Sequence, residues 1–147
     1  MNIEDVDVLT LIPQRPPFVM ISKLLSVENH AVCAELLIGK GNILSANGTF
    51  TEAGIIEHIA QTCAAGMGYA NIHIYNNTIK IGFLSAIRNL NITRLPKVGE
   101  TLHTQISLLE HVMGMTLIKS EVKINDEIIA EGEIKIFITD IDNEVDT

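Results

Sequence analysis

The stretch Gly54-Ile-Ile-Glu57-His58-Ile-Ala-Gln61-Thr-Cys-Ala-Ala-Gly-Met-Gly-Tyr69 decides the fold of this 147-residue chain. It has the character of a helix that is apolar on almost every side, and such a helix is a buried one. We predict a helix over residues 53–70, with Thr49 or Thr51 as its N-cap. Its many Ala and Gly residues would let a surrounding sheet approach closely.

A carboxyl group interrupts this apolar helix near its start. Glu57 is followed one helical turn later by Gln61 on the same face, and no Lys or Arg occurs between residues 41 and 79. A buried carboxyl group without a basic partner can carry protons near neutral pH. Glu57 is therefore a candidate catalytic residue rather than a stabilising one, and Gln61 is expected to hydrogen-bond to backbone or to Glu57.

The rest of the chain has the patterns of β-strands. Residues 101–110 alternate apolar and polar side chains with period two, as half-buried strands do. The expected strands are residues 18–25 and 31–38 before the helix, and 81–93, 101–110, 115–124 and 127–138 after it. This order predicts an α+β domain with a single antiparallel sheet wrapped around one long central helix. Pairing of sheet edges in a dimer would cover the long edge strands.

Charge and composition narrow the function classes. The net charge is −8, and seven of the 18 acidic residues lie in residues 1–9 and 140–147, which we expect to be solvated acidic tails. The remainder is near neutral and has no basic cluster, so no nucleic-acid partner is expected. Length favours a single domain over 1–147.

Several further classes of protein are disfavoured. Cys33 and Cys63 lie in apolar runs without metal-ligand spacing, so we expect reduced core cysteines, no metal site and a cytoplasmic protein. The N-terminus has no signal-peptide pattern. Polar residues such as Glu57 and Gln61 break the longest apolar stretch, which argues against a membrane span.

Three segments resemble the hotdog-fold 3-hydroxyacyl-acyl-carrier-protein dehydratases. Residues 11–21, Leu-Ile-Pro-Gln-Arg-Pro-Pro-Phe-Val-Met-Ile, are similar to the opening of that family. Residues 54–61 resemble its helix, where a glutamate and a glutamine recur at this spacing. Val98-Gly99-Glu100 before a long strand is similar to its second half. The resemblance covers nearly the whole chain and implies a hotdog fold with a dimer as the basic unit.

The resemblance also implies a reaction, the removal of water from a 3-hydroxyacyl thioester. A base takes the proton beside the thioester carbonyl, an acid protonates the departing hydroxyl, and an N–H group at the helix start polarises the carbonyl. Carried over, Glu57 is the catalytic acid/base, the N–H of Gly54 or Ile55 is the polarising donor, and Gln61 lies in the substrate site. Gly54 would let the thioester approach closely. No cofactor is implied.

The implied partner is an acyl carrier protein with its acyl-phosphopantetheine thioester. Because such carriers are acidic, six basic residues are candidates for a docking patch, namely Arg15, Lys40, Lys80, Arg88, Arg94 and Lys97.

One departure from the family concerns its catalytic histidine, which lies before the helix in a Gly-His-Phe-Pro-Gly context. Residues 41–54 contain no His and no Pro, and Gln14 stands where His is common. The chain resembles most the divergent branch of aryl-polyene and flexirubin-type pigment clusters, some of whose members are thought to work paired with a second dehydratase subunit.

Other polar residues have two readings each. Asn47 precedes Gly48, which favours a turn residue, and the alternative is an assisting polar group at the mouth of the site. His58 points about 100° away from Glu57 on a helix. A structural or dimer-contact role is therefore favoured over assistance in catalysis. The other four histidines are expected on the surface or in loops.

Three functions stay open at this point: a dehydratase, a hotdog acyl-ACP or acyl-CoA thioesterase in which Glu57 activates water, and a non-catalytic acyl-binding subunit of a heterodimeric dehydratase. An acyl tunnel beside the helix would be lined by Ile55, Ile59, Cys63 and Met67 or by Ile56, Ala60 and Ala64, and the competing reading of both stripes is core packing.

Overall fold

A six-stranded antiparallel sheet forms the body of the computed structural model, which describes residues 2–28, 30–74 and 80–140, with only the backbone for 80–83 and 138–140. The strand order is β1-β2-β6-β7-β8-β5. The strands are β1 Lys23–Glu28, β2 Ala31–Leu37, β5 Lys80–Ile92, β6 Thr101–Val112, β7 Met115–Ile124 and β8 Glu127–Asp140. Two short strands, β3 Ser45–Ala46 and β4 Thr49–Phe50, make a separate hairpin.

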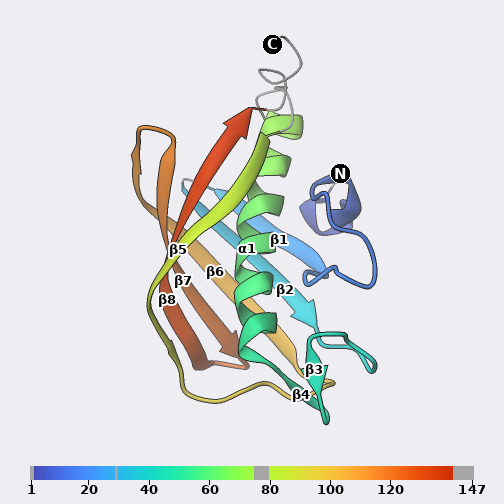
Figure 1. Ribbon diagram of the computed structural model, residues 1–147. Helices are drawn as coiled ribbons and strands as arrows, with labels where there is room; N and C mark the ends of the chain where they lie inside the picture. Colours follow the sequence, from blue (N-terminus) through green and yellow to red (C-terminus); the bar gives the residue numbers. More distant parts are fainter. Residues whose placement is uncertain (1, 29, 75–79, 141–147) are drawn as a thin grey trace.

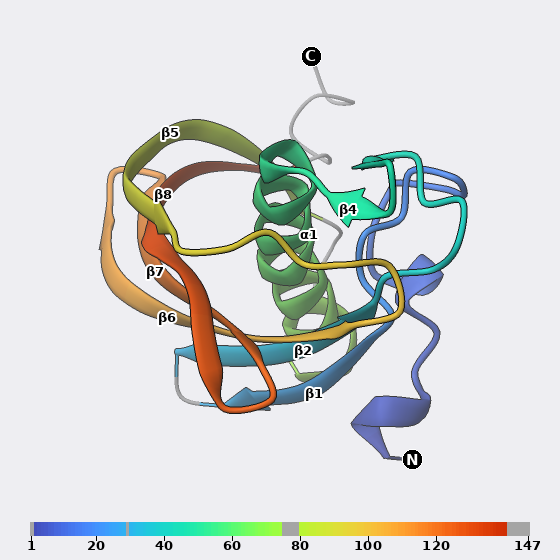
Figure 2. The same ribbon diagram turned by 90° about the horizontal axis from the view of Figure 1, so that it is seen from below.

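Helix α1 spans Glu52–Tyr69 and continues into a π-helical turn over Ala70–Ile74. Thr51 is the N-cap, one of the two predicted candidates, and Glu52 places a negative charge in the positive first turn. Figure 2 shows the sheet curving around this helix. The predicted α+β architecture, one antiparallel sheet wrapped around one long helix, is confirmed.

The main core lies between the helix and the concave face of the sheet. Ile55, Ile59 and Cys63 of α1 belong to a buried cluster with alternate residues of the long strands, among them Leu102, Ile106, Ile118, Val122, Ile134 and Ile136. The period-two prediction for β6 is confirmed, because Leu102, Thr104 and Ile106 are buried whereas His103 and Gln105 are exposed.

The N-terminal segment covers another side of the helix, away from β5 and β8 (Figure 1). Val8, Leu11 and Ile12 are buried in a second cluster with Ala65 of α1. The prediction of a solvated tail over residues 1–9 is therefore confirmed only for its acids: Glu4, Asp5 and Asp7 are exposed, whereas Val8 is buried. The predicted tail at the other end lies, beyond Asp140, outside the described residues.

Strand boundaries differ from prediction mainly at the start. β1 begins at Lys23 rather than at residue 18, because backbone groups of Phe18 and Met20 bond to helix side chains. The predicted turn at Asn125-Asp126 is confirmed, with Asn125 at φ 46° between β7 and β8. The other predicted strands are present within a few residues of their expected ends.

Candidate active site

One strip of helix α1 stays partly open while its other faces are covered by the sheet and the N-terminal segment. The strip consists of exposed Ala53 and the half-buried residues Ile56, Glu57, Ala60, Ala64 and Met67. Glu57 is the one ionisable side chain in this set. The expectation that Glu57 is buried is therefore wrong, because neither covering layer reaches this strip within the chain. A carboxyl group on an open apolar strip can meet a substrate or another subunit.

Gln61 fixes one oxygen of the Glu57 carboxyl group. The Gln61 amide Nε2 donates to Glu57 Oε1 at 2.8 Å and to the Phe18 carbonyl at 2.9 Å, and Gln61 Oε1 accepts from the Met20 N–H at 2.6 Å. Gln61 is only 1% exposed. Its predicted role, a buried polar residue bonded to backbone and to Glu57, is confirmed.

The second oxygen of Glu57 is available for chemistry. Among the side chains that the structure describes, none donates a hydrogen bond to Glu57 Oε2 and none forms an ion pair with this residue. The carboxyl group is thus held at Oε1 and free at Oε2, which is the arrangement that a proton-transfer group needs.

His58 is fully buried inside its own subunit. Its Nδ1 lies 2.7 Å from the Met20 carbonyl oxygen, and its Nε2 lies 2.7 Å from Thr104 Oγ1. Burial lowers the pKa of His58 to about 4, so the imidazole is neutral at physiological pH. The structural reading of His58 is supported, whereas a dimer-contact role is excluded because no part of the side chain reaches the surface.

The start of the helix differs from expectation in its donors. The Gly54 N–H donates to Thr51 Oγ1 at 3.3 Å, and the Ile55 N–H donates to the Thr51 carbonyl at 3.1 Å. Both expected thioester donors thus already have a partner, whereas the N–H groups of Glu52 and Ala53 have none among the described residues.

Phe50 explains the glycine at position 54. A Cβ atom at Gly54 would lie 2.5 Å from the Phe50 ring carbon Cζ, and Phe50 is fully buried. The missing side chain therefore makes room for an aromatic ring of this chain, a packing role that the sequence analysis did not foresee.

Asn47 lies in the turn between β3 and β4. It adopts φ 54° and Gly48 follows at φ 79°, the left-handed conformation that Asn and Gly tolerate best. Asn47 is exposed, and none of the described hydrogen bonds joins it to Glu57. The favoured reading as a turn residue is confirmed.

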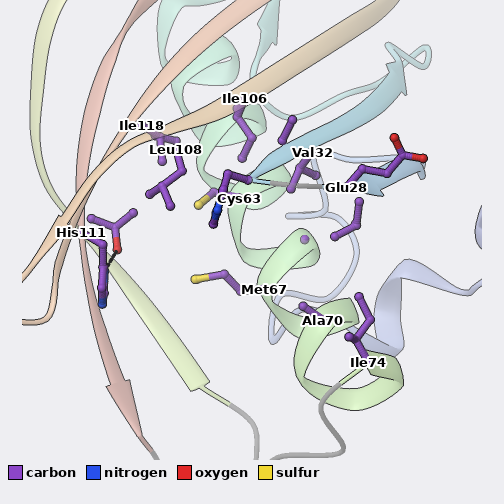
Figure 3. A pocket seen from close by; sticks show the side chains of 15 residues that line it. Glu28, Val32, Cys63, Met67, Ala70, Ile74, Ile106, Leu108, His111 and Ile118 are labelled. Atoms are coloured by element: carbon purple, nitrogen blue, oxygen red, sulfur yellow. Dashed lines mark hydrogen bonds between the residues drawn. The ribbon is translucent and has the colours of Figure 1, made fainter.

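A cavity of about 510 Å³ lies between the second half of the helical segment and the sheet (Figure 3). Cys63, Gly66, Met67 and Ala70 of the helical segment form one wall, and Val32, Ile106, Leu108 and Ile118 of the sheet form the other. At 100° per residue, Cys63, Gly66 and Ala70 lie roughly 180° to 240° around the helix from Glu57. The cavity therefore does not include Glu57, although Met67 of the open strip also lines it.

The two stripes expected to line an acyl tunnel lie in different parts of the structure. In the first stripe, Ile55 and Ile59 are fully buried in the core, and only Cys63 and Met67 reach the cavity. The second stripe, Ile56, Ala60 and Ala64, lies on the open strip beside Glu57.

Comparison with known proteins decides the family. The family model described as ApeP-like, ApeP dehydratase, matches residues 6–146. The chain belongs to the ApeP-like dehydratase family. The predicted resemblance to hotdog dehydratases, including its divergent pigment-cluster branch, is confirmed.

Relatives and solved structures agree with this family. The chain is 27% identical to the 3-hydroxyacyl-[acyl-carrier-protein] dehydratase FabZ of Acetivibrio thermocellus, over 92% of this chain and 94% of the relative. It is 24% identical to FabZ of Ruminiclostridium cellulolyticum, over 90% and 95%. The dehydratase heterocomplex ApeI:P from Xenorhabdus doucetiae matches with a TM-score of 0.84 at 16% identity, covering 96% of each chain, which shows the shared hotdog fold.

The predicted docking patch of this ApeP-like chain is only partly available. Arg94 donates to both oxygens of Glu100, at 3.0 and 3.2 Å, and to Glu127 at 3.0 Å. Lys40 and Lys97 are exposed and form no ion pair among the described side chains. The side chain of Lys80 lies outside the described residues.

Cys63 and the remaining histidines follow the predictions, whereas Cys33 is not a core residue, because it is only half-buried and lines a small pocket with His103 and Gln105. Cys33 and Cys63 are free, and burial raises the pKa of the Cys63 thiol to about 12. The other four histidines are exposed, and His103 and His111 lie on strand β6: His30, His73, His103 and His111. In the described ranges, no three His, Cys, Asp or Glu residues are grouped to hold a metal ion. No helix of these ranges has the length and apolarity to cross a membrane.

Proposed function

We propose that this chain is a 3-hydroxyacyl-thioester dehydratase subunit in which Glu57 transfers the proton. The observation that carries the proposal is the Glu57 carboxyl group on the open strip, with Oε1 held by Gln61 and Oε2 free. The family assignment and the FabZ relatives, which are named for 3-hydroxyacyl-[acyl-carrier-protein] dehydration, support this choice of reaction.

The reaction removes a proton from carbon 2 and hydroxide from carbon 3 of the acyl chain, which leaves a double bond and one water. Glu57 Oε2 takes the carbon-2 proton when ionised, or donates its proton to the departing hydroxyl when protonated. The N–H of Ala53, which has no partner among the described residues, polarises the thioester carbonyl in place of Gly54 or Ile55.

A second hotdog subunit supplies the other proton-transfer group. Residues 41–54 contain no histidine, His58 is buried, and none of the other four histidines belongs to the open strip of α1. A partner docked over Ile56, Ala60 and Ala64 would bury this apolar strip and bring its own side chains to Glu57. The similar ApeI:P structure is a dehydratase heterocomplex, which supports this assembly.

The substrate is presented by an acyl carrier protein. Lys40 and Lys97, which are exposed and outside the described ion pairs, are suited to an acidic carrier surface. Hydrogen bonds link the two surrounding segments, from Gly99 N–H to the Ile38 carbonyl and from Ile38 N–H to the Glu100 carbonyl, so both lysines lie at one end of the molecule.

The test is incubation of the chain with a 3-hydroxyacyl-acyl-carrier protein, alone and with a histidine-containing hotdog subunit, followed by intact-mass spectrometry. The proposal predicts loss of one water in the mixed sample and dependence of that loss on Glu57. Release of free acid would favour a thioesterase instead. A mixed sample whose rate is unchanged by Glu57→Gln would overturn the proposed role of this residue.

A second candidate function is an acyl-binding subunit without catalysis. The cavity of about 510 Å³ on the sheet side of the helix favours it, because ligand pockets are commonly of this size and mostly apolar with a few polar side chains, here Glu28, His30, His111 and Thr116. This candidate predicts that a fluorescent fatty acid binds the chain and that Ala70→Leu, which narrows the cavity, weakens binding while Glu57→Gln does not.

A further inference from the structure

Three polar groups from three separate elements meet beside the helix without reaching solvent. His58 of α1 is 0% exposed, and it lies between the Met20 carbonyl of the N-terminal segment and the Thr104 hydroxyl of β6. Thr104 is 2% exposed. Buried polar side chains are costly unless they are fully hydrogen-bonded. A cluster of a His, a Thr and a backbone carbonyl in an apolar core therefore suggests a role beyond packing.

The hydrogen bonds assign the proton on the ring. A carbonyl oxygen can only accept, so the 2.7 Å contact to Met20 requires a proton on His58 Nδ1. The neutral imidazole then has an acceptor at Nε2, and the Thr104 hydroxyl donates to it across 2.7 Å. Both nitrogens have one assigned role, and the ring orientation is fixed from both sides.

Met20 connects this ring to Glu57. Its carbonyl accepts from His58, and its own N–H donates to Gln61 Oε1 at 2.6 Å. The Gln61 amide then donates to Glu57 Oε1 at 2.8 Å. A continuous series of four hydrogen bonds thus runs from Thr104 in the sheet, through His58, Met20 and Gln61, to the carboxyl group on the open strip.

We propose that His58 is a positioning residue, which through Met20 and Gln61 fixes the Glu57 carboxyl group for proton transfer. The inference rests on the proposed function of Glu57 and deepens it. Phe18 and Met20 belong to no strand: the Phe18 N–H donates to the Arg15 carbonyl, and the other described hydrogen bonds of their backbone go to the helix side chains of Gln61 and His58. Loss of the His58 contact frees the Met20 peptide to move, and the Gln61 amide and the Glu57 carboxyl group move with it.

The test compares four substitutions in the full chain, assayed with its partner subunit where that is needed for turnover. His58→Leu removes both contacts, and His58→Asn keeps a donor near the former Nδ1. Thr104→Val removes only the hydroxyl that orients the ring. Thr62→Val is the matched control, because Thr62 is equally buried and its hydroxyl donates to the His58 carbonyl within the helix, outside the series.

Two readouts separate positioning from plain stability. We expect His58→Leu to lower kcat by about 10-fold or more with KM within about twofold, since small displacements of a catalytic group cost rate rather than binding. Thr104→Val should lower kcat by a smaller factor, and His58→Asn should restore most of the loss. Thr62→Val should leave kcat unchanged. The same variants are followed by the ¹³C signal of the Glu57 carboxyl group and by hydrogen exchange of the Met20 amide.

A double substitution tests the route of the effect. In a Gln61→Ala background the series is already broken, so adding His58→Leu should cost no further kcat, although stability continues to fall. Multiplicative kcat losses would overturn the inference, because His58 would then act independently of Gln61.

The ¹³C signal of the Glu57 carboxyl group and the hydrogen exchange of the Met20 amide test the positioning role without any turnover. If Glu57→Gln leaves the rate unchanged, the proposed function fails, but the series can still be tested by these signals. If His58→Leu and Thr104→Val leave both signals as in the unsubstituted chain, His58 does not position Glu57, whatever the reaction is. Should His58→Leu fail to fold, Thr104→Val alone decides between the two results.

Discussion

The first and second halves of helix α1 are built in opposite ways. Residues 54–61 carry His58 and Gln61, which short hydrogen bonds tie to β6 and the N-terminal segment, and Glu57, which Gln61 holds in turn. Residues 63–70 present Cys63 and Ala70 to a cavity of about 510 Å³ whose walls are mostly apolar, although His30 and His111 also line it. Directional bonds fix geometry, whereas apolar contacts tolerate changes of volume. The first half is suited to chemistry and the second to holding an apolar group of variable shape.

The largest stability effect is expected from Gln61→Leu in the first half. This change leaves the buried Met20 N–H and the part-buried Phe18 carbonyl without their Gln61 partner, which should cost about 3–4 kcal/mol of unfolding free energy. Denaturant unfolding measures it. The matched control is Gln105→Leu on the exposed face of β6, which should change stability by no more than about 0.5 kcal/mol. Equal effects at the two sites would mean that the Gln61 hydrogen bonds to Met20 and Phe18 do not stabilise the fold.

Acid should destabilise the protein through His58, which lies in the first half of the helix. Burial lowers the pKa of His58 from 6.5 to about 4, so between these pH values the unfolded chain binds the proton that the folded chain rejects. The destabilisation from His58 should therefore be absent above pH 6.5. The unfolding free energy should fall by about 3 kcal/mol as the pH drops toward 4. Unfolding curves of the unsubstituted chain and of His58→Asn measure this contribution. A loss of the same size in both chains would contradict it.

Tight packing at the helix start predicts an intermediate effect. A methyl group at position 54 would meet the buried Phe50 ring, so Gly54→Ala should cost about 2 kcal/mol although alanine favours helices. Thermal unfolding against Gly39→Ala provides the comparison, because a Cβ at Gly39 meets nothing within 4 Å. A stabilised Gly54→Ala protein would show that the Phe50 ring moves aside at little energetic cost.

The smallest effect is expected where the second half has room. Ala70→Leu places methyl groups into the cavity and should change stability by less than about 1 kcal/mol. Ala65→Leu, in the closely packed second cluster, should cost about 3 kcal/mol. The difference between the two unfolding free energies measures how much more room there is at Ala70 than at Ala65. Equal losses would mean that the cavity cannot accommodate a leucine side chain.

The sequence predicted the architecture well because its signals are local. Apolarity all round marked the helix, and period-two alternation marked β6, so both could be read without knowing the contacts. The N-terminal segment was misjudged because its acids were visible while the burial of Val8, Leu11 and Ile12 depends on the helix that they cover.

The site was predicted only as far as helix spacing reaches. Glu57 and Gln61 are one turn apart, so their hydrogen bond followed from the 3.6-residue period. The contact of His58 with Thr104 joins residues 46 positions apart, and its link to Met20 spans 38. No local pattern encodes such pairs. The exposure of Glu57 was missed for the same reason, since it depends on which faces other segments leave open.

The proposed dehydration depends most directly on Glu57, and one substitution tests this dependence. Glu57→Gln keeps an oxygen that can accept from Gln61, so the fold should be retained, while proton transfer is lost. Dehydration of a 3-hydroxyacyl-acyl-carrier protein by the chain with its partner subunit is followed by intact mass. We predict at least a roughly 100-fold slower loss of water for Glu57→Gln, and an unchanged rate for Glu52→Gln, an exposed acid of the same helix. A Glu57→Gln protein that dehydrates at the unsubstituted rate would contradict proton transfer by Glu57.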